Sequence, residues 1–262
     1  MFAEATLKGI VDERIWRYDN TTYFRLRVET RSRETGGLFT IALPKNVSRS
    51  MPHPLRAGLF VSVSAMPRLR EMDETLATFI KNATGAPPPL NGYDATRLHA
   101  HRLQTDFVAK AIFILDAPEA VQAAATLSGV VDQRIWMYED MLHFRLRVLH
   151  RLEDTDTGKP QTSFFTVVVP RSVTKSLPRR IAAGDRALVE ATLQQREHEE
   201  TLATFLGNAV GDRPDLGDYD ATQLRVPRTK IDFVVKTMIV RPVAEAESQI
   251  IPASPEMAVA SA

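Results

Sequence analysis

The sequence predicts an all-β protein of two tandem five-stranded barrels, each with a short helix after its third strand. Two observations favour this architecture. The stretch LKGIVDERIWRY (residues 7–18) returns as LSGVVDQRIWMY (127–138), so the chain holds two copies of one unit of about 110 residues. Within each copy, apolar residues alternate with polar ones at a period of two, which is typical of half-buried strands rather than helices.

The repeat also predicts the domain boundaries. Matching residues of the two copies are 120 positions apart up to the second strand and 126 positions apart from the third strand onward. The change arises because the stretch EDTDTGK (153–159) adds residues at an expected hairpin tip of the second copy. FTIALPKNVSRSMP (39–52) matches FTVVVPRSVTKSLP (165–178), and ETLATF (74–79) returns at 200–205. We therefore expect a first domain over 1–116, a linker over 117–126, a second domain over 127–241 and a disordered tail over 242–262.

The first three strands of each copy are predicted by alternation. After the first strand at 7–18, the stretch YFRLRV (23–28) places Phe24, Leu26 and Val28 on one face and two arginines on the other. A third strand follows at 39–43 and ends at Pro44, which cannot donate to a sheet ladder. The proline-rich KNVSRSMPHPL (45–55) then has room for only a turn or two of helix.

The rest of each copy predicts a hairpin and a closing strand. Gly58 precedes a fourth strand, and AMPRLREM (65–72) with ETLATFI (74–80) suggests a long hairpin, which LQQREHE (193–199) and ETLATFL (200–206) repeat. Excursions rich in proline and glycine follow within 80–105 and 206–231, where Tyr93 and Tyr219 are expected to hold them onto the barrels by hydrogen bonds. The apolar stretches DFVAKAIFIL (106–115) and DFVVKTMIV (232–240) close the copies. This strand order is that of a small Greek-key barrel of the OB type.

Composition excludes several classes of function. The chain has no cysteine, which removes disulfides, thiolate catalysis and cysteine-based metal sites. No H-E-x-x-H, G-x-G-x-x-G or Walker pattern occurs, so we expect no catalytic residue, no metal site, no cofactor and no enzymatic activity. No signal segment and no apolar run long enough to span a membrane is visible, and a cytoplasmic protein is expected.

An ordered set of short patterns resembles a known family. The set comprises Leu7-x-Gly9, Arg17-Tyr18 before a turn, the strand FRLRV, the arginine-rich loop TRSRETG (30–36) and LRAGLFVSVSA (55–65). In this order, and present twice, it resembles the bacterial single-stranded DNA-binding proteins of the OB-fold family. The resemblance implies sequence-independent binding of single-stranded DNA in replication, repair or recombination, near the nucleoid. It also implies a homodimer that brings four OB folds together.

The chain departs from this family in three respects. Aromatic side chains are usual on the third strand, but Phe39 and Phe165 are predicted to point inward, which leaves Phe164 as the outward candidate. Met137 stands at the position of Arg17 in the second copy. No acidic, partner-recruiting tail is recognised, because the chain ends in PEMAVASA.

A site that coats single strands needs cations for the phosphates and flat rings for the bases. An Arg-x-Arg strand is also compatible with an ordinary solvated face, and a tryptophan with packing at a barrel end, so both interpretations stay open. The first copy (7–115) holds 16 Lys and Arg against 10 Asp and Glu, and the second (127–240) holds 16 of each, which predicts that the first contributes more of the electrostatic affinity. The predicted nucleic-acid-binding residues are Trp16, Arg17, Tyr18, Tyr23, Arg25, Arg27, Arg31, Arg33, Arg68, Arg70, Trp136, Tyr138, Arg145, Arg147, Phe164 and Arg196.

Two other functions remain compatible with this sequence. One is a tandem-barrel module for protein interaction or assembly, which the near-neutral second copy and the lack of aromatics on the third strand favour. The other is RNA or oligosaccharide binding on the same fold.

Overall fold

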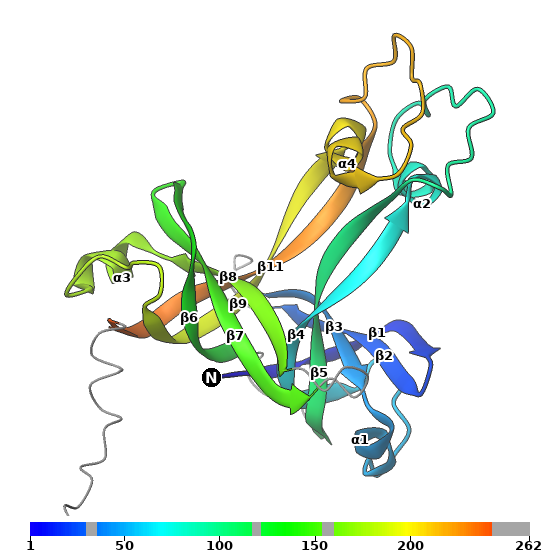
Figure 1. Cartoon of the computed structure of the whole chain (residues 1–262). Coiled ribbons are helices and arrows are strands. Elements are labelled where there is room, and N and C mark those ends of the chain that lie inside the picture. Colours follow the sequence, from blue (N-terminus) through cyan, green and yellow to red (C-terminus); the bar gives the residue numbers. More distant parts are fainter. Residues whose placement is uncertain (30–35, 117–121, 154–159, 243–262) are drawn as a thin grey trace, which may run out of the picture.

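The structure is a computed structural model that describes residues 1–29, 36–116, 122–153 and 160–242. Within these residues the chain is mostly strand, and all eleven strands join in one continuous sheet (Figure 1). Part of the expected linker (117–121), most of the expected tail (243–262) and the tip at 154–159 lie outside the described residues.

The five strands of the first half form a closed circuit of ladders. They are β1 (Phe2–Tyr18), β2 (Thr21–Glu29), β3 (Gly36–Leu43), β4 (Phe60–Thr75) and β5 (His99–Ile114). The antiparallel ladders β1–β2, β2–β3, β1–β4 and β4–β5 are completed by a parallel ladder between β3 and β5.

The second half repeats the circuit and is joined to the first edge to edge. Its strands are β6 (Gln122–Tyr138), β7 (Met141–Glu153), β8 (Pro160–Val169), β9 (Arg186–Thr201) and β11 (Arg225–Arg241), with β10 (Ala209–Val210) outside the circuit. The parallel ladder here joins β8 to β11. An antiparallel ladder between Phe2–Lys8 of β1 and Gln122–Ser128 of β6 makes the two circuits one sheet. Residues 122–126 of the expected linker therefore belong to a strand.

The period-two pattern places the main core as predicted. Phe24, Leu26, Val28 and Phe39 are all fully buried, and Phe165 is 1% exposed. Close approach of neighbouring strands explains the Leu-x-Gly pattern. A Cβ atom added to Gly9 would lie 2.2 Å from the Arg27 carbonyl oxygen, so only glycine fits at this point of β1.

The predicted helix after the third strand is present in both halves, as α1 (Lys45–Arg49) and α3 (Arg171–Ser176). The predicted hairpin within 65–80 is wrong. β4 continues to Thr75, whose hydroxyl accepts a hydrogen bond from the Thr78 amide and caps α2 (Leu76–Asn82). A second copy of this arrangement caps α4 (Leu202–Asn208), so the prediction for 193–206 is also wrong. The apolar residues of ETLATF lie three positions apart, which suits one face of a helix.

The two excursions form a second, smaller body, which we call the lobe; it comprises α2, α4 and residues 83–98 and 209–224 (Figure 1). Its core is separate from the main one and contains the fully buried Phe79 and Phe205, with ring centroids 4.7 Å apart. Each excursion binds the other half. The Tyr93 hydroxyl donates to the Asp212 carbonyl (2.6 Å), and the Tyr219 hydroxyl donates to the Ala86 carbonyl (2.7 Å). The tyrosines thus form hydrogen bonds, but each bond joins the two excursions to one another and not, as expected, an excursion to its barrel.

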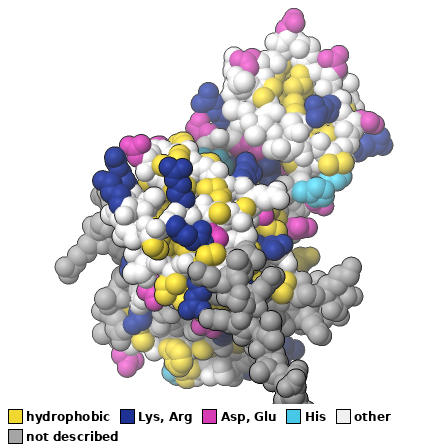
Figure 2. Space-filling model, turned by 60° about the vertical axis from the view of Figure 1, so that its left-hand side comes forward, with side chains coloured by type: hydrophobic (Ala, Val, Ile, Leu, Met, Phe, Trp, Pro, Cys, Tyr) yellow, Lys and Arg dark blue, Asp and Glu magenta, His cyan; other side chains and the backbone are white. Residues whose placement is uncertain are grey.

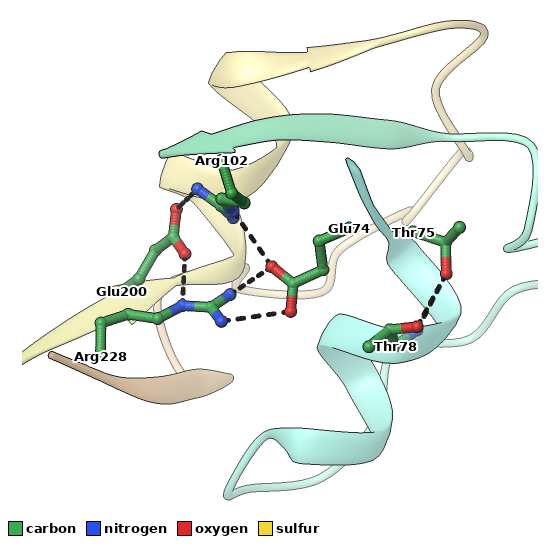
Figure 3. Close-up of polar contacts among 6 residues, drawn as sticks. All are labelled: Glu74, Thr75, Thr78, Arg102, Glu200 and Arg228. Carbon is green, nitrogen blue, oxygen red and sulfur yellow. Dashed lines mark hydrogen bonds and ion pairs between the residues drawn. The ribbon is translucent and has the colours of Figure 1, made fainter. Parts of the chain in front are cut away.

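A buried ion network stands at the base of the lobe (Figure 3). Glu74 and Glu200, 6% and 7% exposed, each accept hydrogen bonds from both Arg102 and Arg228. Two carboxylates and two guanidinium groups balance in charge, which is how such groups are tolerated away from water. Because one residue of each type comes from each half, the network joins the halves at the base of the lobe, in addition to the β1–β6 ladder.

Candidate nucleic-acid interface

A stack of cationic and aromatic side chains lies on the outer face of β1 and β2. The Trp16 ring is stacked on Tyr23 with centroids 5.6 Å apart and an interplanar angle of 14°. The Arg14 guanidinium covers Trp16 at 5.3 Å, and Arg70 from β4 covers Tyr23 at 5.8 Å. Both rings are half-buried, with an exposed arginine as the outer cover of Trp16.

Carboxylates hold two arginines of the first half, Arg70 and Arg27, in place. Arg70 donates through Nε to Asp106 at 2.6 Å, and Asp106 also accepts from Gln104 at 3.1 Å. Burial raises the pKa of Asp106 above its ordinary value of 3.8, against the opposing effect of the Arg70 charge. Arg27 pairs with Asp12 at 3.0 Å. A phosphate that binds these arginines must therefore compete with an internal partner.

A groove of about 1340 Å³ separates this face from the strands that support the lobe. Arg25 and Arg27 line it from β2, while residues 102–105 of β5 and 227–231 of β11 line the other side. Arg25 is half-buried and makes no ion pair with any residue that the structure describes. The groove is thus bordered by cations of both halves.

The second half carries a related stack with one substitution. Trp136 is stacked on His143 at 5.4 Å and 22°, with Arg134 over Trp136 at 5.8 Å. His143 replaces Tyr23 of the first half, is only 2% exposed and has no hydrogen-bond partner of normal geometry among the described residues. Burial lowers its pKa below the ordinary 6.5; Asp232 opposes this change, and Arg196 adds to it.

Two further arginines cover rings on the same face. Arg196 lies 5.7 Å from the Tyr138 ring and pairs with Asp232 at 2.9 Å. Arg145 lies 5.2 Å from the ring of Phe164, which is half-buried and outward as predicted. Lys and Arg side chains are seen on the body of the molecule and around its junction with the lobe (Figure 2).

The structure therefore brings most of the predicted residues into two clusters, one in each half. Arg17 and Tyr18 extend the first cluster as exposed side chains at the end of β1, while Arg68 and Arg147 are exposed on β4 and β7. Arg31 and Arg33 lie outside the described residues.

Sequence reasoning missed four contributors, Arg14, Arg134, His143 and Lys230. The two arginines lie two residues before the tryptophans, and that i, i+2 spacing on a strand was the available signal. Asp106 and Asp232, which occupy matching positions in the two copies, are the ion-pair partners of Arg70 and Arg196.

The described residues hold no group of three or more side chains that could bind a metal ion, and none of their helices has the length and apolarity of a membrane span.

Comparison with known proteins identifies a shared fold. No protein-family model and no curated protein matches this sequence. Among solved structures, the chain is similar to two crystal structures of the single-stranded DNA-binding protein from Thermus aquaticus. A deletion mutant matches at 13% identity over 97% of this chain and 98% of that one, with a TM-score of 0.55. The wild-type protein matches at 14% identity over 92% and 93%, with a TM-score of 0.54. At this low sequence identity, the similarity shows a shared fold and no more.

Proposed function

We propose that this protein binds single-stranded DNA without sequence preference and protects it during replication, repair or recombination. The observation that carries the proposal is the arginine–aromatic stack, which occurs at matching positions of both halves. Proteins that coat single strands combine stacking rings with cations that follow the backbone. The fold shared with the Thermus aquaticus protein supports the same function.

The stacks suggest how a strand would bind. Arg14 and Arg134 are exposed, so a base can displace either guanidinium and take its place on the tryptophan ring. One base stacked in this way contributes about 1–3 kcal/mol. The displaced arginine remains beside the nucleotide and is available to its phosphate. We further propose that each circuit of five strands is one OB-type barrel, with domains over 1–116 and 127–241, and that the protein has no catalytic activity.

Titration with nucleic acids tests this proposal. Because both tryptophans lie within the proposed site, their fluorescence should be quenched when a base stacks on them. We expect strong quenching by oligo-dT at low salt and little by duplex DNA, with affinity falling steeply as salt rises. Absence of binding to oligo-dT at low salt would refute the function. Equal binding of oligo-U would favour the broader class of single-stranded nucleic acids over DNA alone.

We also propose that two copies associate through an exposed sheet face. Strands β5, β4, β1, β6, β9 and β11 are joined in this order. The outer side of this sheet carries Phe2, Leu188 and Ile239 in one cross-strand row, exposed by 44%, 38% and 57%. Phe113, 62% exposed, occupies the corresponding row of the first half. Exposed apolar side chains gathered on one face are typical of an interface, and a second copy would cover them.

Sedimentation equilibrium tests the association. The wild-type chain should have the mass of a dimer, and Phe113→Asp combined with Ile239→Asp should have that of a monomer. Met137→Asp is the control, because Met137 is equally exposed (62%) but lies at the far end of β6. A monomeric wild type, or a dimer that survives the double substitution, would refute this interface.

A further inference from the structure

Lys230 is a cation held among other cations in the second half. It is half-buried on β11, directly opposite Arg196 of β9 in the ladder. Within the described part of the chain it has neither a hydrogen bond nor an ion pair. The one acid beside it, Asp232, is already bound by Arg196 at 2.9 Å.

Three arginines lie close enough to Lys230 for their charges to act on it. Burial lowers the pKa of Lys230 below its ordinary 10.5; the Asp232 charge opposes this, and the charges of Arg196, Arg145 and Arg134 lower it further. Each of these arginines lies over an aromatic ring, namely Tyr138, Phe164 and Trp136. Four cations thus face one carboxylate beside three rings.

The described residues of the first half form no such site, although the first copy is the more basic one. Gln104 occupies the position that matches Lys230, and its amide donates to Asp106 at 3.1 Å and to Thr40 at 3.4 Å. In the second half the corresponding carboxylate oxygen, Asp232 Oδ1, has no hydrogen-bond partner among the described residues. At this position the first half therefore satisfies its polar groups internally, whereas the second half has an ammonium with no ion pair to any described residue.

We propose that Lys230, with Arg134, Arg145 and Arg196, forms an anion site that takes a phosphodiester group of the bound strand. The proposal rests on the proposed single-stranded DNA binding and deepens it by assigning the main phosphate site to the second half. A phosphate oxygen would supply the missing counter-charge, and the adjacent rings would receive the neighbouring bases.

Lys230 also connects this site to the groove. It lines the groove together with Arg25 of β2. A strand whose phosphate rests on Lys230 can therefore continue along the groove to the first half, so that one ligand contacts both halves. Of the acids of the second copy, Asp212, Asp215 and Asp218 lie in the lobe, away from this path, whereas Glu197 lines the groove.

The test uses the full chain, oligo-dT and two single substitutions. Lys230→Gln introduces the residue type that Gln104 provides at the matching position of the first half. Lys236→Gln is the control, because it removes an exposed lysine of the same strand and changes the net charge by the same amount. We expect Lys230→Gln to weaken oligo-dT binding about tenfold, as for loss of a hydrogen bond between charged groups. It should also reduce the slope of log affinity against log salt by about 0.7, the value for one phosphate contact on a single strand. Lys236→Gln should leave both quantities near those of the wild type.

The outcomes separate the site from the general function. If the wild type binds oligo-dT and the two variants bind alike, the anion site is refuted and the function stands. If the wild type does not bind, both fall. A lower melting temperature of Lys230→Gln with unchanged affinity would mean that the lysine serves Asp232 within the protein, which also refutes the site.

Discussion

Loss of the Glu74 carboxylate should release the lobe from the rest of the protein. Glu74 is 6% exposed and accepts from Arg102 Nε (3.1 Å) and from Arg228 Nη1 (3.1 Å) and Nη2 (2.6 Å). In Glu74→Ala, Glu200 alone would face two partly buried guanidinium groups, which leaves a net positive charge. Breaking a buried pair in this way costs about 3–5 kcal/mol.

Amide hydrogen exchange measured on peptides of the lobe gives the local effect. Tryptophan fluorescence would not, because both tryptophans lie in the five-stranded circuits. Since every 1.4 kcal/mol is tenfold in an equilibrium constant, lobe amides should exchange about two to three and a half orders of magnitude faster in Glu74→Ala. Peptides of β2 and β7 should change far less.

The neighbouring acid supplies the matched control. Asp73 pairs with His101, but the two side chains are 60% and 67% exposed, and such surface pairs contribute at most about 1 kcal/mol. Asp73→Ala should therefore leave exchange of the lobe nearly unchanged. If Glu74→Ala and Asp73→Ala behaved alike, the network would not be what holds the lobe in place.

Three further results are expected. The pKa of His143 is lowered on folding, so the unfolded chain binds more protons just below pH 6.5 and the stability of the protein falls there as the pH falls. His143→Tyr, which introduces the residue type that Tyr23 provides in the first half, should therefore reduce the loss of melting temperature between pH 7 and 5. An unchanged loss would exclude His143 as its source. Phe79→Ala should lower the free energy of unfolding, measured by chemical denaturation, by about 3–5 kcal/mol. A decrease below about 1 kcal/mol would show that the core of the lobe contributes little to stability. Arg25→Ala should weaken oligo-dT binding more than Arg27→Ala, because Arg27 must first exchange its Asp12 partner; the opposite order in a titration would contradict a groove path through Arg25.

Much of the fold could be predicted because local pattern and global packing agree. Phe24, Leu26 and Val28 alternate in the sequence and are fully buried, and Pro44 ends the third strand where α1 begins. The helix at 76–82 could not be recognised by alternation. Two signals mark this helix: the capping residue Thr75, and the spacing of three between the buried Leu76 and Phe79, which suits one face of a helix.

The arrangement of the candidate site was only partly predictable. Period-two spacing puts Arg25 and Arg27 on the outer face, but which arginine meets a carboxylate depends on contacts between distant strands. Arg70 and Asp106 are 36 residues apart, and nothing local marks them as partners. Whole-copy charge was an even weaker guide, because it does not show that the four cations of the Lys230 site face a single carboxylate, Asp232.

The reciprocal contacts of the lobe bear on the order in which the chain can fold. Tyr93 and Asp212 are 119 residues apart, and Glu74 and Arg228 are 154 apart, so these contacts cannot form until most of the chain has been synthesised. Contacts of such long sequence separation form slowly, and exposed apolar surface favours aggregation in the meantime. A ribosome that has finished only the first copy has released Leu76 and Phe79 without the residues that cover them. We accordingly expect the two copies together, rather than either copy alone, to be the cooperative folding unit.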